Sequence, residues 1–151
     1  MLTQLRRTLV AALPEEGCAL LLGEPLPQPS FAVGSQWRLT RIWPCRNSWM
    51  PQQERFRRFA LDPREQLLAQ RWARQRGLAV LGSAHSHPRG QPRPSGTDLA
   101  LAYTPALQLI LAPADGWRPR AWWLEATPAG PAAAIAVPCR LDPPSLWRME
   151  D

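Results

Sequence analysis

The fold is decided by one stretch of the sequence, Leu78-Ala-Val-Leu-Gly-Ser-Ala-His85-Ser-His87-Pro-Arg-Gly-Gln-Pro-Arg-Pro-Ser95-Gly-Thr-Asp98. Its first seven residues form a short, mostly apolar run, which is typical of a strand buried in the core. The run leads directly into the only two histidines of the chain, and a loop rich in proline and glycine follows. The stretch therefore predicts an extended segment over 78–87, whose end carries ionisable side chains, and then a return of the chain to a helix.

Two further elements are predicted upstream of this stretch. Leu5, Leu9 and Leu13 recur at helical spacing and predict a helix over 3–13, which the following proline ends. The continuous apolar run 18–22 predicts a second buried strand.

A second helix begins with a strong start signal. Asp62 is predicted as its N-cap, Pro63 as its first residue and Glu65 as the acid of a capping box, and Gly77 ends it. The remaining predictions are strands over 36–43, 107–112, 120–125 and 132–137, a short helix over 98–103 and irregular chain over 44–61.

These elements predict an α/β protein with a mixed sheet flanked by helices, because helices and strands alternate early and strands dominate late. The length of 151 residues suits one domain, 1–151, with a core over about 3–137 and a proline-rich tail over 138–151.

The composition is basic in an unusual way. All 18 basic residues are arginine, against 12 acidic residues, and the pI is about 10.8. Such a charge is compatible with an anionic partner, but also with a genome-wide bias in composition. The sequence has neither a long apolar run nor a recognisable signal peptide, so we expect a cytoplasmic protein without a membrane segment. Three widely spaced cysteines, Cys18, Cys45 and Cys139, are expected to be reduced thiols.

The two histidines predict a metal site. In an extended segment, His85 and His87 project from the same face, and Asp98 at the start of the next helix can add a carboxylate. Two histidines, one carboxylate and an open position are typical of catalytic zinc. Zinc lowers the pKa of its water to about 7, and a glutamate that is not a ligand usually takes the proton. Ser95 is a candidate donor to the oxyanion.

Simpler explanations exist for the same residues. A histidine pair in a proline-rich loop is often only solvated, and Ser95 is also suited to cap a helix that begins near residue 97. The metal site is the favoured interpretation because both histidines fall at the end of one buried strand, with an acid at the next helix start.

The two histidines are followed after seven residues by Ser95 and, after two more, by Asp98. This pattern resembles the JAMM (MPN+) motif of zinc metallo-isopeptidases. The upstream block Pro14-Glu-Glu16-Gly-Cys18-Ala-Leu-Leu-Leu-Gly23 is similar to that family's Pro-x-Glu-x-Cys block. The resemblance implies a single-domain MPN-like (JAMM) fold with a curved sheet. It also implies one Zn2+ per chain, held by His85, His87 and Asp98, with Ser95 at the oxyanion and Glu16 as the general base.

Glu15 and Glu24 are the rivals of Glu16 for the role of base, and only Glu16 has the Glu-x-Cys spacing. Two positions depart from the family pattern. Ala19 replaces a glycine, at little cost unless φ is positive there, and Ala84 replaces an aromatic residue, which we expect to alter the wall of the substrate groove.

Small prokaryotic members of the family resemble peptidases that act after the C-terminal Gly-Gly of ubiquitin-like sulfur-carrier proteins. The resemblance therefore implies such a carrier or its C-terminal conjugate as the substrate, and no nucleic acid. A cluster of arginines is a candidate surface for an acidic carrier or simply a solvated helix face: 55, 57, 58, 64, 71, 74 and 76.

Two other functions remain open. One is a zinc-binding interaction domain without catalysis. The other is a basic RNA-binding module, which requires aromatic side chains interleaved with arginines on one exposed face or groove. The adjacent Trp122 and Trp123 argue against that module, because one of them must point inward if the segment is a strand.

Overall fold

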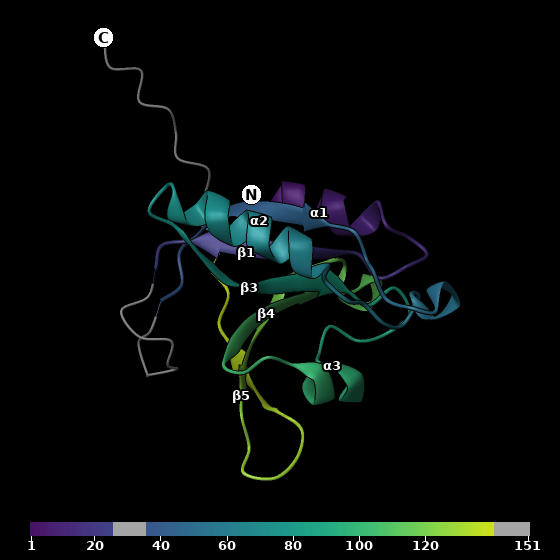
Figure 1. Cartoon of the computed structure of the whole chain (residues 1–151). Helices are drawn as coiled ribbons and strands as arrows, with labels where there is room; N and C mark the ends of the chain where they lie inside the picture. Colours follow the sequence, from purple (N-terminus) through teal and green to yellow (C-terminus); the bar gives the residue numbers. More distant parts are fainter. Residues whose placement is uncertain (26–35, 141–151) are drawn as a thin grey trace.

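Six strands form one sheet, in the order β2-β1-β3-β4-β5-β6, in the computed structural model, which describes residues 1–25 and 36–140 (Figure 1). The β3–β4 pair is parallel and the other pairs are antiparallel. The predicted mixed α/β sheet is therefore confirmed. The strands are β1 Cys18–Gly23, β2 Leu39–Cys45, β3 Ala79–Ser86, β4 Ala106–Leu111, β5 Arg120–Glu125 and β6 Ala133–Val137.

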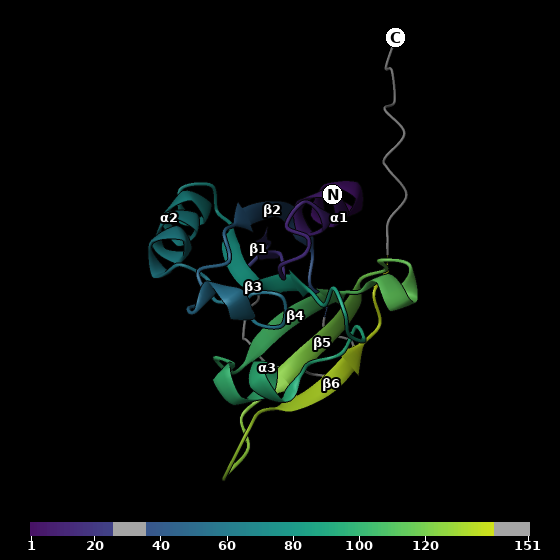
Figure 2. The same cartoon turned by 90° about the vertical axis from the view of Figure 1, so that its right-hand side faces the viewer.

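Helices cover both faces of the sheet. The helix α1 (Leu2–Val10) buries Leu5 and Leu9 in a core formed mainly with β1, β4 and β5. The helix α2 (Pro63–Arg74) buries Ala69 and Ala73 against Leu20 and Leu22 of β1. Neighbouring residues of a strand point to opposite faces, so the two helices lie on opposite sides of β1, as Figure 2 shows. The shorter helices are α3 (Gly96–Leu101) and the 3-10 turns Gln52–Glu54 and Pro113–Asp115.

Several predicted boundaries are wrong. The strand expected over 36–43 runs over Leu39–Cys45 and includes Pro44, which is tolerated because β2 lies at the edge of the sheet. The helix expected over 3–13 ends at Val10, and Leu13 is exposed. The short helix begins at Gly96 rather than Asp98, because Ser95 caps it.

The start of α2 is only partly as predicted. Asp62 is the N-cap, and its carboxylate accepts a hydrogen bond from the backbone N–H of Arg64. Glu65 does not complete a capping box. Its Oε2 instead accepts a hydrogen bond from the indole of Trp43 at 2.8 Å, which ties the helix to β2.

The part of the chain that is described has no helix long and apolar enough to cross a membrane. The expected proline-rich tail lies outside the described residues from 141 onward.

Gly82 allows the parallel pair β3–β4 to form. A Cβ atom at this position would lie 1.9 Å from the backbone oxygen of Leu107 on β4, which is closer than any real contact. We expect Gly82→Ala to destabilise the protein by about 3 kcal/mol or more, because backbone atoms of a central strand must shift. Chemical denaturation would measure the loss. As a control, Gly96→Ala places a Cβ with nothing within 4 Å and should change the stability little. An unchanged midpoint for Gly82→Ala would contradict the β3–β4 register.

Candidate metal centre

Four buried side chains from three separate parts of the chain meet at one place. His85 and His87 lie at the end of β3, Asp98 lies in the first turn of α3, and Glu16 lies just before β1. None of the four is more than 9 % exposed. A cluster of ionisable groups this deeply buried needs a physical reason, because burying unpaired charge is costly.

The ligand atoms of the cluster point toward one another. The Nε2 atoms of His85 and His87 lie 2.9 Å apart, and the Oδ2 atom of Asp98 lies 3.3 Å and 3.2 Å from them. The Oε1 atom of Glu16 lies 4.0 Å from Nε2 of His87. Glu16, His85 and His87 could together hold a metal ion, since one ligand atom from each lies within 4.8 Å of the others.

The sheet register explains how Glu16 comes close to the histidines. Cys18 of β1 pairs directly with His85 of β3, so the residues before β1 run beside the end of β3. As predicted, His85 and His87 share one face. Ala84 lies on the opposite face, fully buried in the core beneath α1, so the expectation that it shapes the substrate groove is wrong. Ala19 is buried there too, without a positive φ.

Glu15 and Glu24, the other candidates for the general base, contact different parts of the protein. Glu15 is half-buried beside a different hollow, together with Arg55 and Cys45. Glu24 is exposed beyond the far end of β1, 3.8 Å from Arg38. Neither is part of the histidine cluster.

The two imidazole rings are held in different ways. The Nδ1 atom of His87 makes a 2.7 Å hydrogen bond with the backbone oxygen of Gln91, which orients the ring. The Nδ1 atom of His85 is buried and has no hydrogen-bond partner among the described residues. Its ring is instead stacked on Phe59, with centroids 4.3 Å apart and planes inclined by 20°.

Ser95 and Asp98 form a capping box. The Ser95 hydroxyl accepts a hydrogen bond from the backbone N–H of Asp98 at 3.1 Å, and the Ser95 N–H donates to Oδ2 of Asp98 at 2.7 Å. The predicted cap role of Ser95 is therefore confirmed. The hydroxyl still has its own proton to donate, so the cap leaves a role at the oxyanion open.

The environment shifts the pKa values of all four groups. Burial raises the pKa of Glu16 to about 8, although the charge of His87 acts in the opposite direction. Burial lowers the pKa of His85. Burial also acts to lower the pKa of His87, but hydrogen bonds with Asp98 and Gln91 outweigh it and the pKa is raised. Burial acts to raise the pKa of Asp98, yet hydrogen bonds from both histidines hold it well below its usual range.

The donor set fits a zinc ion. Ligands at 2.0–2.1 Å from a tetrahedral zinc ion lie roughly 3.4 Å apart, close to the separations of 2.9 to 3.3 Å among the two Nε2 atoms and Oδ2. The second oxygen of Glu16, Oε2, is buried and has no partner among the described residues. A cation would neutralise the cluster of Nε2 and Oδ2 atoms, and a water bound to it would give Oε2 of Glu16 a hydrogen-bond partner.

Two residues near the site were not anticipated from the sequence. Asn47 and Phe59 lie in the segment 46–61, between β2 and α2, which shows no periodic pattern. Phe59 stacks on His85, and the Asn47 amide donates to the backbone oxygen of Glu16. A single asparagine in an irregular segment carries no sequence signal for such a contact.

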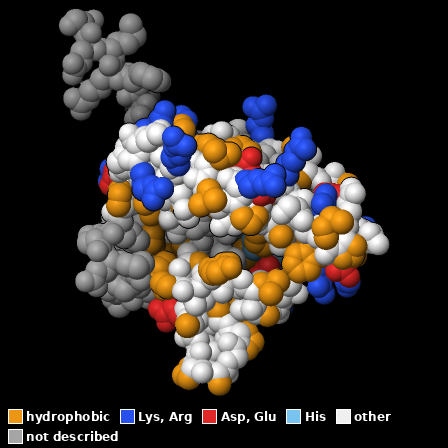
Figure 3. Space-filling view, in the orientation of Figure 1, with side chains coloured by type: hydrophobic (Ala, Val, Ile, Leu, Met, Phe, Trp, Pro, Cys, Tyr) orange, Lys and Arg blue, Asp and Glu red, His pale blue; other side chains and the backbone are white. Residues whose placement is uncertain are grey.

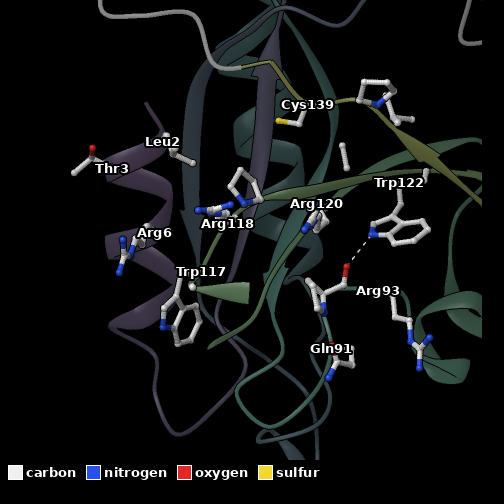
Figure 4. Close-up of a pocket in the computed structure, with 17 residues that line it drawn as sticks. Leu2, Thr3, Arg6, Gln91, Arg93, Trp117, Arg118, Arg120, Trp122 and Cys139 are labelled. Carbon is white, nitrogen blue, oxygen red and sulfur yellow. Dashed lines mark hydrogen bonds between the residues drawn. The ribbon is translucent and has the colours of Figure 1, made fainter. Parts of the chain in front are cut away.

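A separate groove of about 1150 Å³ begins at the loop that follows His87 and reaches α1 (Figure 4). Gln91, whose backbone oxygen holds His87, is part of its wall. Its wall is rich in arginines and also carries two tryptophans: Arg6, Arg93, Arg118, Arg120, Trp117 and Trp122.

The sheet and the buried cluster together define a small α/β domain with a candidate metal centre. The chain belongs to the family described as prokaryotic homologs of the JAB domain, whose profile matches residues 1–125. The six-stranded sheet with its helices is consistent with a JAB/MPN-like fold.

The chain is similar to several solved structures, two of which are described here. The solution structure of a protein from Desulfitobacterium hafniense is 29% identical, with a TM-score of 0.69, over 89% of this chain and 84% of that one. The solution structure of a protein from Salinibacter ruber is 33% identical, with a TM-score of 0.56, over 84% of this chain and 78% of that one. No curated protein matches the chain.

Proposed function

We propose that the protein is a zinc-dependent peptidase or isopeptidase of the cytoplasm, which hydrolyses the amide bond after the C-terminal Gly-Gly of a ubiquitin-like sulfur-carrier protein. The observation that carries the proposal is the convergence of two Nε2 atoms and one carboxylate oxygen, with the buried carboxylate of Glu16 beside them. Membership in a family of JAB-domain proteins supports it.

In this proposal, His85, His87 and Asp98 hold the metal. Zinc, when bound, supplies a water of lowered pKa and a Lewis acid for the carbonyl of the substrate. Glu16 stays outside the ligand set, because its Oε1 atom lies 4.0 Å from Nε2 of His87 whereas Oδ2 of Asp98 lies within 3.3 Å of both rings.

Glu16 acts as the general base in this proposal. Its carboxylate takes a proton from the attacking water and then gives it to the amine that leaves. Its position supports the role, since the carboxylate is buried beside the cluster with Oε1 4.0 Å from Nε2 of His87. Ser95 donates a hydrogen bond from its hydroxyl group to the oxyanion. A single donor of this kind typically lowers the activation free energy by about 2.7–4 kcal/mol.

The experiment that tests the proposal has two parts. Elemental analysis should find one zinc per chain, and a panel of sulfur-carrier proteins extended by cysteine or a peptide should be cut after Gly-Gly, as read by mass spectrometry. A protein that is purified without metal and cannot be reloaded would refute the proposal. Zinc without any cleavage would favour the non-catalytic interaction domain.

We further propose that the arginine-lined groove receives an acidic face of the carrier. In the described residues, Arg120 pairs with Asp115 at 2.6 Å, while Arg6, Arg93 and Arg118 form no ion pair. The groove adjoins the loop that orients His87, so a carrier bound there is next to the metal centre.

The arginines that the sequence suggested for this role are less suitable. Blue side chains do crowd the top of the molecule above α2 in Figure 3. However, Arg57 and Arg58 are already paired with Glu54, at 3.1 Å and 3.6 Å. Arg55 of this set does line a smaller hollow of about 490 Å³, together with Glu15 and Gly17, but no other arginine of the set lines it.

The reversal Arg118→Glu is expected to raise KM severalfold at low salt and to leave kcat unchanged, because it repels an acidic partner without touching the metal centre. Steady-state kinetics at several salt concentrations would measure this effect. The matched control is Arg71→Glu on α2, which should leave KM unchanged. Equal effects of the two reversals would mean that only the overall charge matters.

The RNA-binding alternative gains one observation, since tryptophans and arginines do share this groove. Both indoles are only half-buried, but Trp117 packs against the core and the Trp122 N–H donates to the backbone oxygen of Pro92 at 3.0 Å (Figure 4). One of the adjacent pair points inward, as predicted; it is Trp123, which is 2 % exposed. Tight RNA binding with a steep salt dependence would support this alternative over carrier docking.

A further inference from the structure

The side-chain amide of Asn47 lies beside the candidate metal centre and is fully hydrogen-bonded. It is 9 % exposed, and it takes part in four hydrogen bonds. Its Nδ2 atom donates to the backbone oxygens of Glu16 at 3.0 Å and Arg58 at 2.8 Å. Its Oδ1 atom accepts from the backbone N–H groups of Trp49 at 3.0 Å and Ala60 at 3.2 Å. This full set uses every donor and acceptor site of the amide.

Glu16 is held by the same segment on its other side. The backbone N–H of Glu16 donates to the oxygen of Arg55 at 2.7 Å. Residues 46–61 therefore form hydrogen bonds with both peptide groups that flank the Glu16 side chain. Glu16 lies before the first residue of β1. β3 holds the chain only from Gly17 onward, whose N–H donates to the hydroxyl of Ser86 at 2.8 Å and whose oxygen accepts from the Ser86 N–H at 3.0 Å. The hydrogen bonds of the Glu16 N–H and oxygen come from residues 46–61.

The carboxylate of Glu16 has little that holds it directly. Its Oε2 atom is buried without a hydrogen-bond partner among the described residues, and Oε1 lies 4.0 Å from the nearest imidazole nitrogen. The direction of this side chain must then follow from its backbone and from packing. The backbone is the part that Asn47 and Arg55 hold.

The same segment also reaches the metal ligands. Phe59, next to the Ala60 that donates to Asn47, stacks on the ring of His85. One irregular segment thus contacts both the base and a metal ligand, and Asn47 ties its two ends together.

We infer that Asn47 is a positioning residue, which sets the place of the Glu16 carboxylate relative to the metal centre. The inference rests on the proposed function for its catalytic consequence. It differs from a role in metal binding, because Asn47 contacts no histidine and its partner Glu16 is outside the ligand set. Displacement of a catalytic group by about 1 Å can cost on the order of 100-fold in rate.

The variant Asn47→Asp tests the inference most sharply. The aspartate keeps an oxygen for the N–H groups of Trp49 and Ala60 and loses the donor to Glu16. We expect kcat to fall by about 10- to 100-fold, with KM and the zinc content unchanged. Hydrogen exchange at the Glu16 amide should become faster, because the contact with Arg55 loosens. The milder variant Asn47→Ser replaces Asn47→Asp if the buried charge prevents folding.

The matched control is Ser48→Ala, which removes a 2.9 Å hydrogen bond to the oxygen of Ala60 in the same segment without touching Glu16. It should retain the wild-type kcat and the wild-type exchange at Glu16. Unchanged kcat in a folded Asn47 variant would overturn the inference, and so would a loss of zinc that parallels the loss of kcat. A Glu16 amide that is unprotected in the wild type would overturn it as well, whichever variants fold.

Failure of the proposed function gives a different result. A wild-type protein that holds no zinc or cuts no carrier refutes the peptidase. The exchange measurements at Glu16 still decide whether Asn47 holds this backbone.

Discussion

Glu16→Gln is expected to reduce cleavage by about 10²- to 10⁴-fold, while the protein keeps its fold and one zinc per chain. The amide of glutamine has nearly the shape of the carboxyl group but cannot take up the proton. Zinc should stay because the carboxylate is farther from the imidazoles than that of Asp98 is. Steady-state cleavage of a carrier conjugate, elemental analysis and circular dichroism would measure the three quantities.

This substitution should not weaken the fold. Burial raises the pKa of Glu16 to about 8, so the folded state disfavours the ionised carboxylate that the unfolded chain carries at neutral pH. We expect the thermal midpoint of the metal-free variant at pH 8 to equal that of the metal-free wild type or to exceed it. Glu15→Gln, at the half-buried neighbouring position, serves as the control and should retain full activity. Activity of Glu16→Gln within tenfold of the wild type would mean that another group accepts the proton.

His87→Gln is expected to abolish stoichiometric zinc binding and, with it, all cleavage. Loss of a hydrogen-bond partner outside the ligand set typically costs about 10–100-fold in metal affinity, and loss of a ligand itself should exceed that range. A competition titration with a chromophoric chelator would measure the affinity. His87 is the better choice for this test than His85, because His85 is fully buried and its loss would also leave a cavity.

The control for His87→Gln is Gln91→Ala. The acceptor for Nδ1 of His87 is the backbone oxygen of Gln91, which this variant keeps, and the Gln91 side chain is exposed. Zinc affinity should therefore match the wild type. Full zinc binding by His87→Gln would show that Glu16 and Asp98 can hold the ion with His85 alone, contrary to the ligand set proposed for it.

The sequence contained enough information to bring the candidate site together. His85 and His87 share a face because the strand period is two, and Asp98 returns to them because a parallel strand pair requires a crossover. Glu16 required the resemblance to a family, since no local pattern separates it from Glu15. Asn47 and Phe59 could not be predicted, because their contacts come from an irregular segment whose path depends on the whole fold.

For the fold, too, elements with a strong local sequence signal could be predicted, and features set by tertiary contacts could not. Strands with strong apolar runs, such as β1, were placed within a residue, because burial on both faces leaves a continuous signal. Edge strand β2 was misplaced because its side chains are mostly exposed or half-buried and its pattern is weak. Sequence spacing alone predicts a helix-cap role for Glu65, whereas its hydrogen bond with Trp43 determines where its side chain lies.

The register between β1 and β3 has a consequence for when the chain can act. Glu16 is translated before the histidines and Asp98, and the strands that join them can pair only afterwards. A nascent or truncated chain that ends before α3 has no complete cluster, so it cannot yet hold the proposed metal ion or act as the proposed peptidase. If the proposed function holds, hydrolysis would then come from the fully folded population alone.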